Sequence, residues 1–367
     1  MPMLRILSIL ILTAATAILS EAQTFKWYNP EEADFRVIQG QAFPDDEREG
    51  YYHRIPSRFQ SQLRRSVWRL GKQTAGESIQ FNTNSSEIRI RYKVNRNIAM
   101  PHMPATGVSG LDLYTRDECG NEVWLTPKYS FKDTISYVYA PIDRKRARLA
   151  DKYTLFLPLY NEVEWLEIGV AQDAEFQFEK PSSKKPIVAY GTSICQGACA
   201  SRPAMAWTNI LRRRLDWPII NLGFSGNAMH EKEVIGLLAE IDAAVYILDG
   251  LPNSYRIPAP ELRDTIVTAV RQLRQQRPDT PIILVDHSGY PQSKVYKVYK
   301  DRQEHAIRSL EEAYRKLKKD GVKGLHYLKY DDIGMIGEMM VEGIHMSDYG
   351  MTTYADAYEK ILRKFLK

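Results

Sequence analysis

Cysteine is scarce in this 367-residue sequence, which contains only Cys119, Cys195 and Cys199. The three stand among acidic and amide neighbours without the paired spacing of a zinc-binding motif, so we expect no structural metal and no cofactor. An exported protein could pair two of them in a disulfide. On one regular helix, however, Cys195 and Cys199 would hardly reach the Cβ separation that a disulfide requires.

An excess of charge of one sign is also missing, as are long apolar segments. The formal net charge is +5, with 44% hydrophobic and 26% charged residues, which is ordinary for a globular protein. The basic runs at residues 212–214 and 315–319 alternate with apolar residues, as on solvated helix faces, so no nucleic-acid partner is expected. After residue 22, no segment is apolar for long enough to span a bilayer, and we find no internal repeat.

The N-terminus has the pattern of an export signal. A basic start at residues 1–5 precedes an apolar run at residues 6–19, which is shorter than the ~20 residues of a membrane span. Ser20 and Ala22 then place small residues at the two positions that a signal peptidase reads. We therefore expect a signal peptide at residues 1–22 and a secreted or periplasmic protein. An uncleaved N-terminal anchor is the alternative.

Residues 23–180 have the pattern of an all-β domain. Over residues 88–94, apolar and charged side chains alternate, which is the period of a strand with one buried face. Further strand candidates are residues 153–159 and 163–170. Helical periodicity is not convincing in this half, except for a turn near residues 60–65. The pattern predicts an antiparallel sandwich that ends at a Pro- and Lys-rich linker over residues 181–186.

From residue 187 onward, apolar strands alternate with amphipathic helices. The strand candidates are residues 187–190, 219–222, 243–248, 282–285 and 325–328. The helix candidates are residues 207–215, 231–240, a segment that begins at Pro260, and residues 302–318 and 354–366. This alternation predicts a parallel sheet with helices on both faces over residues 181–367. Such sheets carry their sites at the carboxyl ends of the strands.

Polar segments follow the predicted strands and would converge on that edge. Ser193 follows the first strand, Gly226 the second and Asn253 the third, whereas His345 lies between the fifth strand and the last helix. A serine nucleophile needs a base, and His345 can be that base. Glu342, three residues earlier, is the candidate acid that would orient the imidazole ring. The backbone N–H groups of Ser193 and Gly226 and the side chain of Asn253 would form an oxyanion hole.

The C-terminal half resembles the SGNH/GDSL hydrolases, whose four blocks contribute a Ser, a Gly, an Asn and a His. These blocks correspond to Gly191-Thr192-Ser193, Phe224-Ser225-Gly226, Leu251-Pro252-Asn253 and Glu342-Gly343-Ile344-His345. The N-terminal half resembles the accessory domain of a subgroup named for a Gly-x-Asp-Leu-Tyr motif, here residues 110–114. The resemblance covers nearly all of the chain after residue 22. It implies an α/β fold, with a flavodoxin-like hydrolase domain preceded by a jelly-roll-like β-sandwich.

Three residues depart from the pattern of that family. Thr192 replaces the aspartate of a Gly-Asp-Ser-Leu motif, which is not catalytic, and Asn253 lacks the usual Gly-x-Asn-Asp surroundings. Glu342 replaces the aspartate expected three residues before the histidine. Because a glutamate is one methylene longer, the loop must adjust if this side chain is to orient His345.

Other residues compete with these assignments. A serine after a strand is often a helix N-cap rather than a nucleophile. His287, after the fourth strand, is a rival base, and Asp348 is a rival acid that we expect instead to cap the last helix. His102 is a candidate for the border of the cleft. Asp112 and Tyr114 are expected to have structural roles in the sandwich or at its interface with the second domain.

These features predict an exported serine esterase that removes acyl groups, and in particular acetyl groups, from a carbohydrate. The expected partner is an acylated glycan or another small ester. Two alternatives stay open. The first is a lipid ester or thioester hydrolase of the same fold. The second is a non-catalytic glycan-binding protein on a decayed hydrolase scaffold, which the glutamate at position 342 and the altered Asn253 block motivate.

Overall fold

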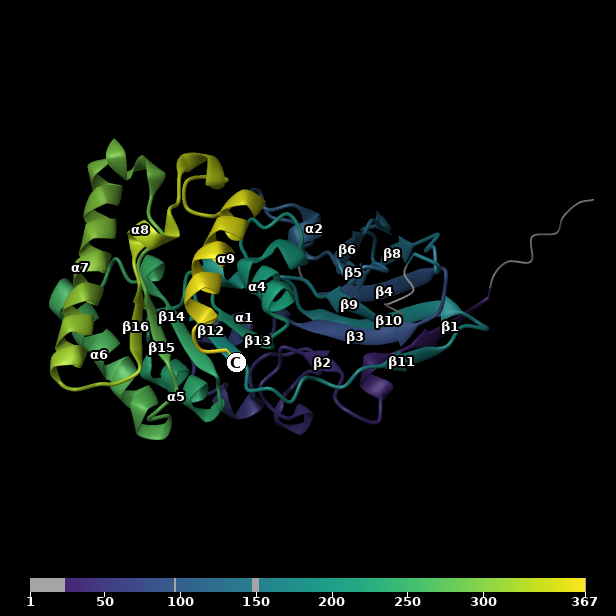
Figure 1. Cartoon of the computed structure of the whole chain (residues 1–367), viewed down its shortest axis with the longest axis horizontal. Coiled ribbons are helices and arrows are strands. Elements are labelled where there is room, and N and C mark those ends of the chain that lie inside the picture. Colours follow the sequence, from purple (N-terminus) through teal and green to yellow (C-terminus); the bar gives the residue numbers. More distant parts are fainter. Residues whose placement is uncertain (1–23, 96, 147–151, 367) are drawn as a thin grey trace, which may run out of the picture.

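The computed structural model describes residues 24–366, except for residue 96 and residues 147–151. The signal peptide expected at residues 1–22 therefore lies outside the described residues. In Figure 1, the strands of the N-terminal half lie beside a parallel sheet and its helices, which belong to the C-terminal half. Among the described residues, no helix combines the length and the apolar character needed to cross a membrane.

The N-terminal half forms two antiparallel sheets. The first contains, in spatial order, β1 (Phe25–Tyr28), β10 (Val163–Ala171), β4 (Ile88–Val94), β8 (Ile135–Tyr139) and β7 (Lys128–Ser130). The second contains β11 (Phe176–Phe178), β3 (Ser78–Thr83), β9 (Lys152–Phe156), β5 (Asp112–Arg116) and β6 (Glu122–Leu125), with β2 (Ile38–Gln39) paired to β3. Along β4, Ile88, Ile90 and Tyr92 are buried and Arg89 and Arg91 are not, as the period of two predicts. The predicted all-β architecture of this half is confirmed.

The C-terminal half is built on a five-stranded parallel sheet. Its strands are β12 (Ile187–Gly191), β13 (Ile219–Gly223), β14 (Val245–Asp249), β15 (Ile282–Val285) and β16 (Leu325–Leu328). The spatial order is β13-β12-β14-β15-β16, which is the flavodoxin-like arrangement. The first four strands are buried along their whole length, because helices cover both faces.

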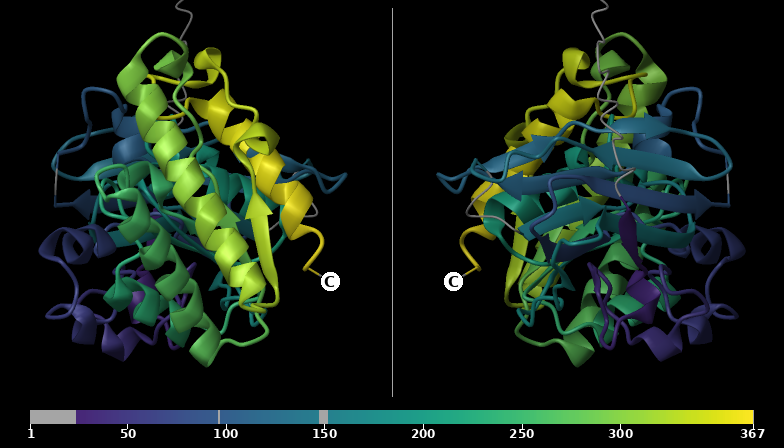
Figure 2. Two further views of the ribbon diagram at one scale, coloured as in Figure 1. Left: turned by 90° about the vertical axis from the view of Figure 1, so that its left-hand side faces the viewer. Right: turned by 90° about the vertical axis from the view of Figure 1, so that its right-hand side faces the viewer.

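The helices divide between the two faces of the parallel sheet. One face packs against α5 (Lys232–Glu240), α6 (Ala259–Gln276) and α7 (Lys297–Lys319), and the other against α4 (Trp207–Leu215) and α9 (Asp348–Leu362). Figure 2 (left) shows α6 and α7 in green and α9 in yellow on opposite sides of the sheet. The short helices are α1 (Arg65–Gly71), α2 (Ala105–Val108), α3 (Ser193–Gln196) and α8 (Tyr330–Ile333). The predicted α/β sandwich is therefore confirmed.

Some helix boundaries differ from the sequence-based prediction. Helix α7 begins at Lys297 and α9 at Asp348, both earlier than predicted. The first turn of α7 contains no buried residue, so its sequence shows no apolar periodicity. The first turns of α9 bury Gly350 and Met351, which lie before the predicted start of this helix at residue 354. The turn expected near residues 60–65 is present, since the Leu63 N–H donates to the Phe59 oxygen at 3.0 Å, but helix α1, which follows it from Arg65, was not predicted.

The two halves share a core. Val67 and Trp68 of α1 belong to the same buried cluster as Tyr190 of β12. In the segment between β2 and α1, the buried guanidinium of Arg54 donates hydrogen bonds to the backbone oxygen of Asn221 at 2.7 Å and to that of Gly223 at 3.3 Å. The N-terminal half is thus fixed directly to the carboxyl end of β13, where the candidate site lies.

Candidate active site

Ser193 is positioned by a tight strand-to-helix connection. β12 ends at Gly191, Thr192 occupies the N-cap position, and Ser193 is the first residue of α3. The side chain of Thr192 accepts the hydrogen bond from the Ile194 N–H at 3.2 Å. The capping role therefore belongs to Thr192, and the hydroxyl of Ser193 is left for another partner. Ser193 is only 7% exposed.

That partner is His345. The Ser193 hydroxyl lies 2.8 Å from Nε2 of His345, and Nδ1 of the same ring contacts Oε1 of Glu342. Because a carboxylate can only accept hydrogen bonds, the ring proton is assigned to Nδ1, and Nε2 accepts from the serine. The structure thus brings Ser193, His345 and Glu342 into one continuous chain of hydrogen bonds.

A local turn accommodates the side chain of Glu342, which is one methylene longer than that of an aspartate. Gly343 adopts a φ of +86°, a left-handed conformation that folds Glu342 back over the loop. The carboxylate then accepts the N–H groups of Ile344 and His345, each at 3.1 Å, in addition to the ring. The turn is held at its base, where the Val341 N–H donates to the backbone oxygen of His345 at 2.8 Å.

The electrostatic surroundings favour a neutral imidazole. Burial lowers the pKa of His345 below its ordinary value, and the adjacent Glu342 opposes this effect only in part. The His345 side chain is 18% exposed and that of Glu342 is 33% exposed. A neutral ring with a free lone pair on Nε2 is the form that can accept the serine proton.

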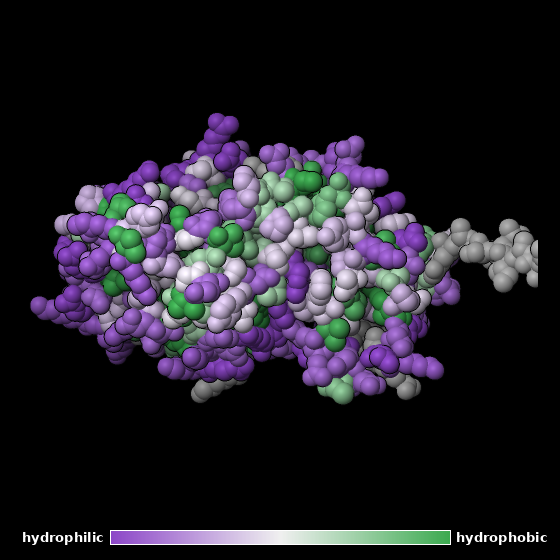
Figure 3. Space-filling model, turned by 90° about the horizontal axis from the view of Figure 1, so that it is seen from above, coloured by the Kyte–Doolittle hydropathy of each residue, from purple (hydrophilic) through white to green (hydrophobic). Residues whose placement is uncertain are grey.

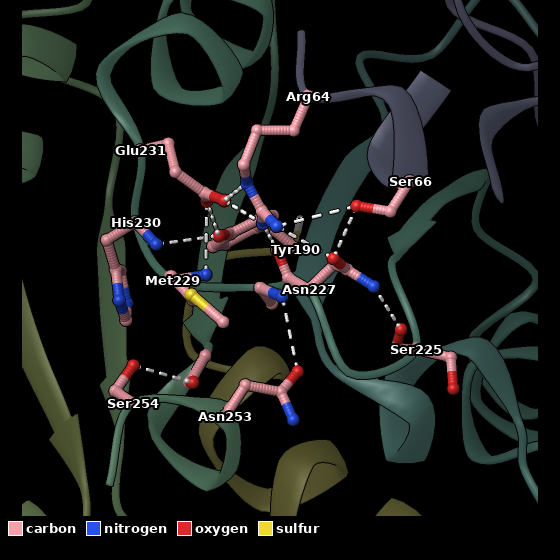
Figure 4. Close-up of polar contacts among 12 residues, drawn as sticks. Arg64, Ser66, Tyr190, Ser225, Asn227, Met229, His230, Glu231, Asn253 and Ser254 are labelled. Carbon is pink, nitrogen blue, oxygen red and sulfur yellow. Dashed lines mark hydrogen bonds and ion pairs between the residues drawn. The ribbon is translucent and has the colours of Figure 1, made fainter. Parts of the chain in front are cut away.

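Three hydrogen-bond donors lie in the loops that follow β12, β13 and β14. Neither the Ser193 N–H nor the Gly226 N–H donates a hydrogen bond to another described residue. Gly226 has a φ of +69°, and a Cβ built on it would have no neighbour within 4 Å, so its amide lies on an open part of the loop. The side-chain oxygen of Asn253, in the turn Leu251–Asn253, accepts the Ala228 N–H at 3.2 Å. Its nitrogen points away from this loop and is available to a ligand (Figure 4).

The loop that carries Gly226 is held by two residues of the N-terminal half. Arg64 donates to Asn227 Oδ1 and to the Asn227 backbone oxygen, each at 2.8 Å, and also forms an ion pair with Glu231. The Ser66 hydroxyl lies 2.6 Å from Asn227 Oδ1 (Figure 4). Sequence reasoning missed Arg64 and Ser66. No local signal marks them, because they precede Asn227 by more than 160 residues.

The rival residues have other roles. His287 is buried, its Nδ1 accepts the Gly289 N–H at 2.9 Å, and burial lowers its pKa to about 3. Asp348 is not the N-cap of α9, a position occupied by Ser347. The carboxylate of Asp348 instead accepts the Ser201 N–H at 2.8 Å and the Ser201 hydroxyl at 2.5 Å. The capping role expected for Asp348 is therefore wrong, and neither residue touches the Ser193–His345 pair.

Residues of the accessory motif lie at the boundary between the halves. Asp112 is buried and accepts the Ala204 N–H at 2.8 Å and a guanidinium nitrogen of Arg202 at 3.0 Å. The same nitrogen of Arg202 donates to the Tyr114 hydroxyl at 2.9 Å. His102, from the segment before α2, stacks on His345 with ring centroids 5.6 Å apart and an angle of 22° between the rings. It therefore borders the candidate site.

A sizeable cavity lies elsewhere. A cavity of about 490 Å³ is lined by β5, β9, Arg212 of α4, and the residues that follow α4, including Asp216 and Trp217. None of the candidate catalytic residues lines it. Arg212 and Trp217 flank the beginning of β13, whereas Ser193 lies beyond the end of β12. This cavity is therefore separate from the candidate site around Ser193 and His345.

Comparisons with known proteins show the family of the chain. A model of the GDSL-like lipase/acylhydrolase family matches residues 184–363, and a model of the GxDLY N-terminus of SGNH-hydrolase-type esterases matches residues 25–176. A search of curated proteins finds no match.

Solved structures resemble the chain over most of its length. A GDSL-like lipase from Bacteroides ovatus ATCC 8483 is 32% identical, with a TM-score of 0.84, and the match covers 94% of this chain and 98% of that one. A salicylyl-acyltransferase from a tetracycline biosynthetic pathway is 18% identical, with a TM-score of 0.70 and coverage of 93% and 97%. An acetyl xylan esterase from the rumen bacterium Butyrivibrio proteoclasticus is 10% identical, with a TM-score of 0.53 and coverage of 92% and 98%. The last two similarities concern the fold alone.

Proposed function

Because the chain belongs to the GDSL-like lipase/acylhydrolase family, we propose that it is an exported serine esterase that removes acyl, and in particular acetyl, groups from a carbohydrate. One observation carries the proposal. The Ser193 hydroxyl, His345 and Glu342 form a continuous chain of hydrogen bonds, and three unused donors lie in the adjoining loops.

The reaction follows from these groups. The Ser193 oxygen attacks the carbonyl carbon of the ester while its proton passes to Nε2 of His345. The N–H groups of Ser193 and Gly226 and the amide nitrogen of Asn253 stabilise the resulting oxyanion. His345 then gives its proton to the leaving alcohol oxygen, and the acyl group stays on the serine.

Water completes the cycle by the reverse sequence of proton transfers. His345 takes a proton from a water molecule, and the hydroxide attacks the acyl carbon. The Ser193 oxygen leaves and recovers the proton from His345, so a carboxylic acid is released and the enzyme returns to its starting state. Glu342 stabilises the imidazolium that forms in both halves of the cycle. No metal or organic cofactor takes part in these steps.

A carbohydrate substrate is supported by two features. The acetyl xylan esterase shares this architecture, and the signal-like residues 1–22 would export the protein to where polysaccharides are found. On the face seen in Figure 3, hydrophobic residues form separate groups among hydrophilic ones, which is ordinary for a surface in contact with water. N-terminal sequencing of the protein recovered from periplasm or medium tests the export step, because cleavage predicts Gln23 as the first residue.

The catalytic proposal is tested with nitrophenyl acetate and a panel of acetylated polysaccharides. Wild type should release acetate, and Ser193→Ala should lower the rate to near background. Equal rates for the two proteins would overturn the proposal. A fluorophosphonate probe separates an active site from a decayed scaffold, since labelling of Ser193 should disappear in His345→Ala.

A lipid ester is the second candidate substrate, and exposed apolar side chains near the site support it. Val341 and Ile344 are 48% and 38% exposed on the loop that carries His345. Ile336 and Tyr349, on the segments that flank this loop in the sequence, are exposed as well. Such a rim would suit a longer acyl chain. Hydrolysis rates along a series of nitrophenyl esters decide, because an acetyl esterase loses activity as the acyl chain lengthens and a lipid esterase gains it.

A further inference from the structure

Next to the catalytic chain, three side chains with metal-binding atoms come together from distant parts of the sequence. They are His102, Cys199 and His345, and one ligand atom of each lies within 4.8 Å of the other two. His102 belongs to the segment before α2, Cys199 to the loop after α3, and His345 to the loop before α9. The accessory half and the hydrolase half therefore both contribute to this cluster.

The spacing is close to that of a tetrahedral site. Zn²⁺ binds imidazole nitrogen at roughly 2.0–2.1 Å and thiolate sulfur at roughly 2.3 Å, so neighbouring ligand atoms of a tetrahedron lie roughly 3.3–3.6 Å apart. Because the present atoms lie within 4.8 Å of one another, they need to approach by no more than roughly 1.2–1.5 Å to reach that distance. The exposed side chain of His102 has room to make this movement.

The backbone and the existing contacts hold the thiol in place. Cys199 adopts a φ of +67°, an uncommon left-handed conformation for a residue other than glycine. Its Sγ lies 3.2 Å from the backbone oxygen of His102, so the thiol faces the segment that supplies the first imidazole. Cys199 is buried and forms no disulfide, as is also true of Cys195, while Cys119 is exposed and free.

The ligand atoms of this cluster favour a particular kind of metal ion. Two imidazole nitrogens and one sulfur suit Zn²⁺, whereas Mg²⁺ and Ca²⁺ prefer oxygen ligands. Three protein ligands leave one tetrahedral position for water. On binding, the thiol proton of Cys199 is released to solvent and the sulfur coordinates as a thiolate.

We propose that His102, Cys199 and His345 form an inhibitory binding site for Zn²⁺, which stops ester hydrolysis by taking the His345 ring away from Ser193. Both nitrogens of that ring are in use, since Nε2 contacts Ser193 and Nδ1 contacts Glu342. Coordination through either nitrogen breaks one of the two contacts. A metal-bound ring cannot accept the serine proton, so the metal and the reaction compete for the same residue.

Direct binding is measured first, on the full mature chain and without reference to activity. Co²⁺ serves as a spectroscopic substitute for Zn²⁺, because a Co²⁺–thiolate bond has a charge-transfer absorption. Wild type should show this absorption, and excess Zn²⁺ should abolish it. Cys199→Ser should not show it, whereas Cys119→Ser, which removes the exposed thiol outside the cluster, should behave as wild type. Absorption that persists in Cys199→Ser would overturn the site.

Inhibition is measured second, with nitrophenyl acetate in buffered free Zn²⁺. This inhibition experiment rests on the proposed function. If the protein has no esterase activity, the inhibition experiment fails but the absorption measurement still shows whether the metal binds. Cys199→Ser and His102→Gln should each raise the half-inhibitory Zn²⁺ concentration at least about tenfold, which is ~1.4 kcal/mol of binding energy. A chelator should restore wild-type activity, and Mg²⁺ should not inhibit. Equal Zn²⁺ sensitivity in wild type and His102→Gln, whose exposed side chain can change without disturbing the core, would refute the inhibitory mechanism.

Discussion

Replacing Glu342 with glutamine tests the hydrogen-bonded series of Ser193, His345 and Glu342 at the residue that departs from the family pattern. Both carboxylate oxygens face only donors, namely the N–H groups of Ile344 and His345 and the ring of His345. A carboxamide has one acceptor and one donor group, so its NH₂ must face either the Ile344 N–H or the imidazole. The first orientation preserves the tautomer of His345, but in both orientations the negative charge is lost.

The size of the effect follows from the exposure of the pair. An imidazolium and a carboxylate about 4 Å apart attract each other by ~1 kcal/mol in water and by ~4 kcal/mol at an effective dielectric constant of about 20. Glu342 is 33% exposed and His345 is 18% exposed, which places the pair between these limits. We therefore expect kcat to fall roughly fivefold to several hundredfold, since ~1.4 kcal/mol corresponds to a factor of ten.

The pH profile separates an electrostatic role from a structural one. His345 must be neutral to act as base, so kcat/KM should rise with pH through its pKa and then level off. Burial already lowers that pKa, and Glu342 partly raises it again. Glu342→Gln should therefore shift the acidic limb to lower pH while lowering the plateau.

Steady-state hydrolysis of nitrophenyl acetate across this pH range supplies both quantities. Glu338→Gln is the matched control, because Glu338 is exposed on the same loop and forms no ion pair with another described residue. A lower plateau without movement of the limb would mean that Glu342 only shapes the loop. An unchanged plateau and limb would remove Glu342 from the catalytic chain altogether.

Three other changes have defined outcomes. Asn253→Ala should lower kcat by about 10²–10³, or ~2.7–4 kcal/mol, with an unchanged circular dichroism spectrum, and a rate near wild type would exclude Asn253 from the oxyanion hole. Arg64→Ala should lower kcat by about tenfold, because the loop that contains Asn227 loses its hydrogen bonds from a charged donor. Arg65→Ala, which changes the neighbouring exposed arginine, should not change kcat. Equal effects of the two substitutions would contradict a specific role for Arg64. Burial raises the pKa of Asp249 to about 7, so the folded state holds a proton that the unfolded state loses near pH ~4, and stability should fall as pH rises between these values. Asp249→Asn should flatten the dependence of Tm on pH in this window, and a slope identical to wild type would show that Asp249 does not titrate there.

Local patterns were sufficient for the elements whose buried positions repeat regularly. The alternation along β4 and the apolar stretch of β12 predict strands close to the observed bounds. A strand buried on one face alternates apolar and polar residues, and a strand buried on both faces is apolar throughout. Helix α4 coincides with its predicted range for the same reason. The choice between Thr192 and Ser193 as the N-cap was beyond such patterns, since adjacent hydroxyls are equivalent in sequence and only the turn geometry separates them.

Contacts between distant segments carry no comparable signal. The bond from Arg64 to Asn227 joins residues 163 positions apart, and the cluster of His102, Cys199 and His345 draws on three separate loops. Cysteine spacing alone predicted no structural metal, because it considers each ligand with its chain neighbours. A site formed by packing of two domains becomes visible only when both are folded together.

These long-range contacts give the accessory half an indirect part in the proposed chemistry, which sequence motifs alone would assign to the hydrolase half. Arg64 holds the loop of Gly226, and the Ala228 N–H in that same loop fixes the amide of Asn253. The proposed oxyanion donors Gly226 and Asn253 follow two strands of the parallel sheet, and both are therefore connected to one loop that Arg64 and Ser66 of the N-terminal half hold. Since such donors stabilise the transition state only when they are held in place beforehand, we expect the N-terminal half to contribute to the rate of the proposed reaction through preorganisation, without touching the ester.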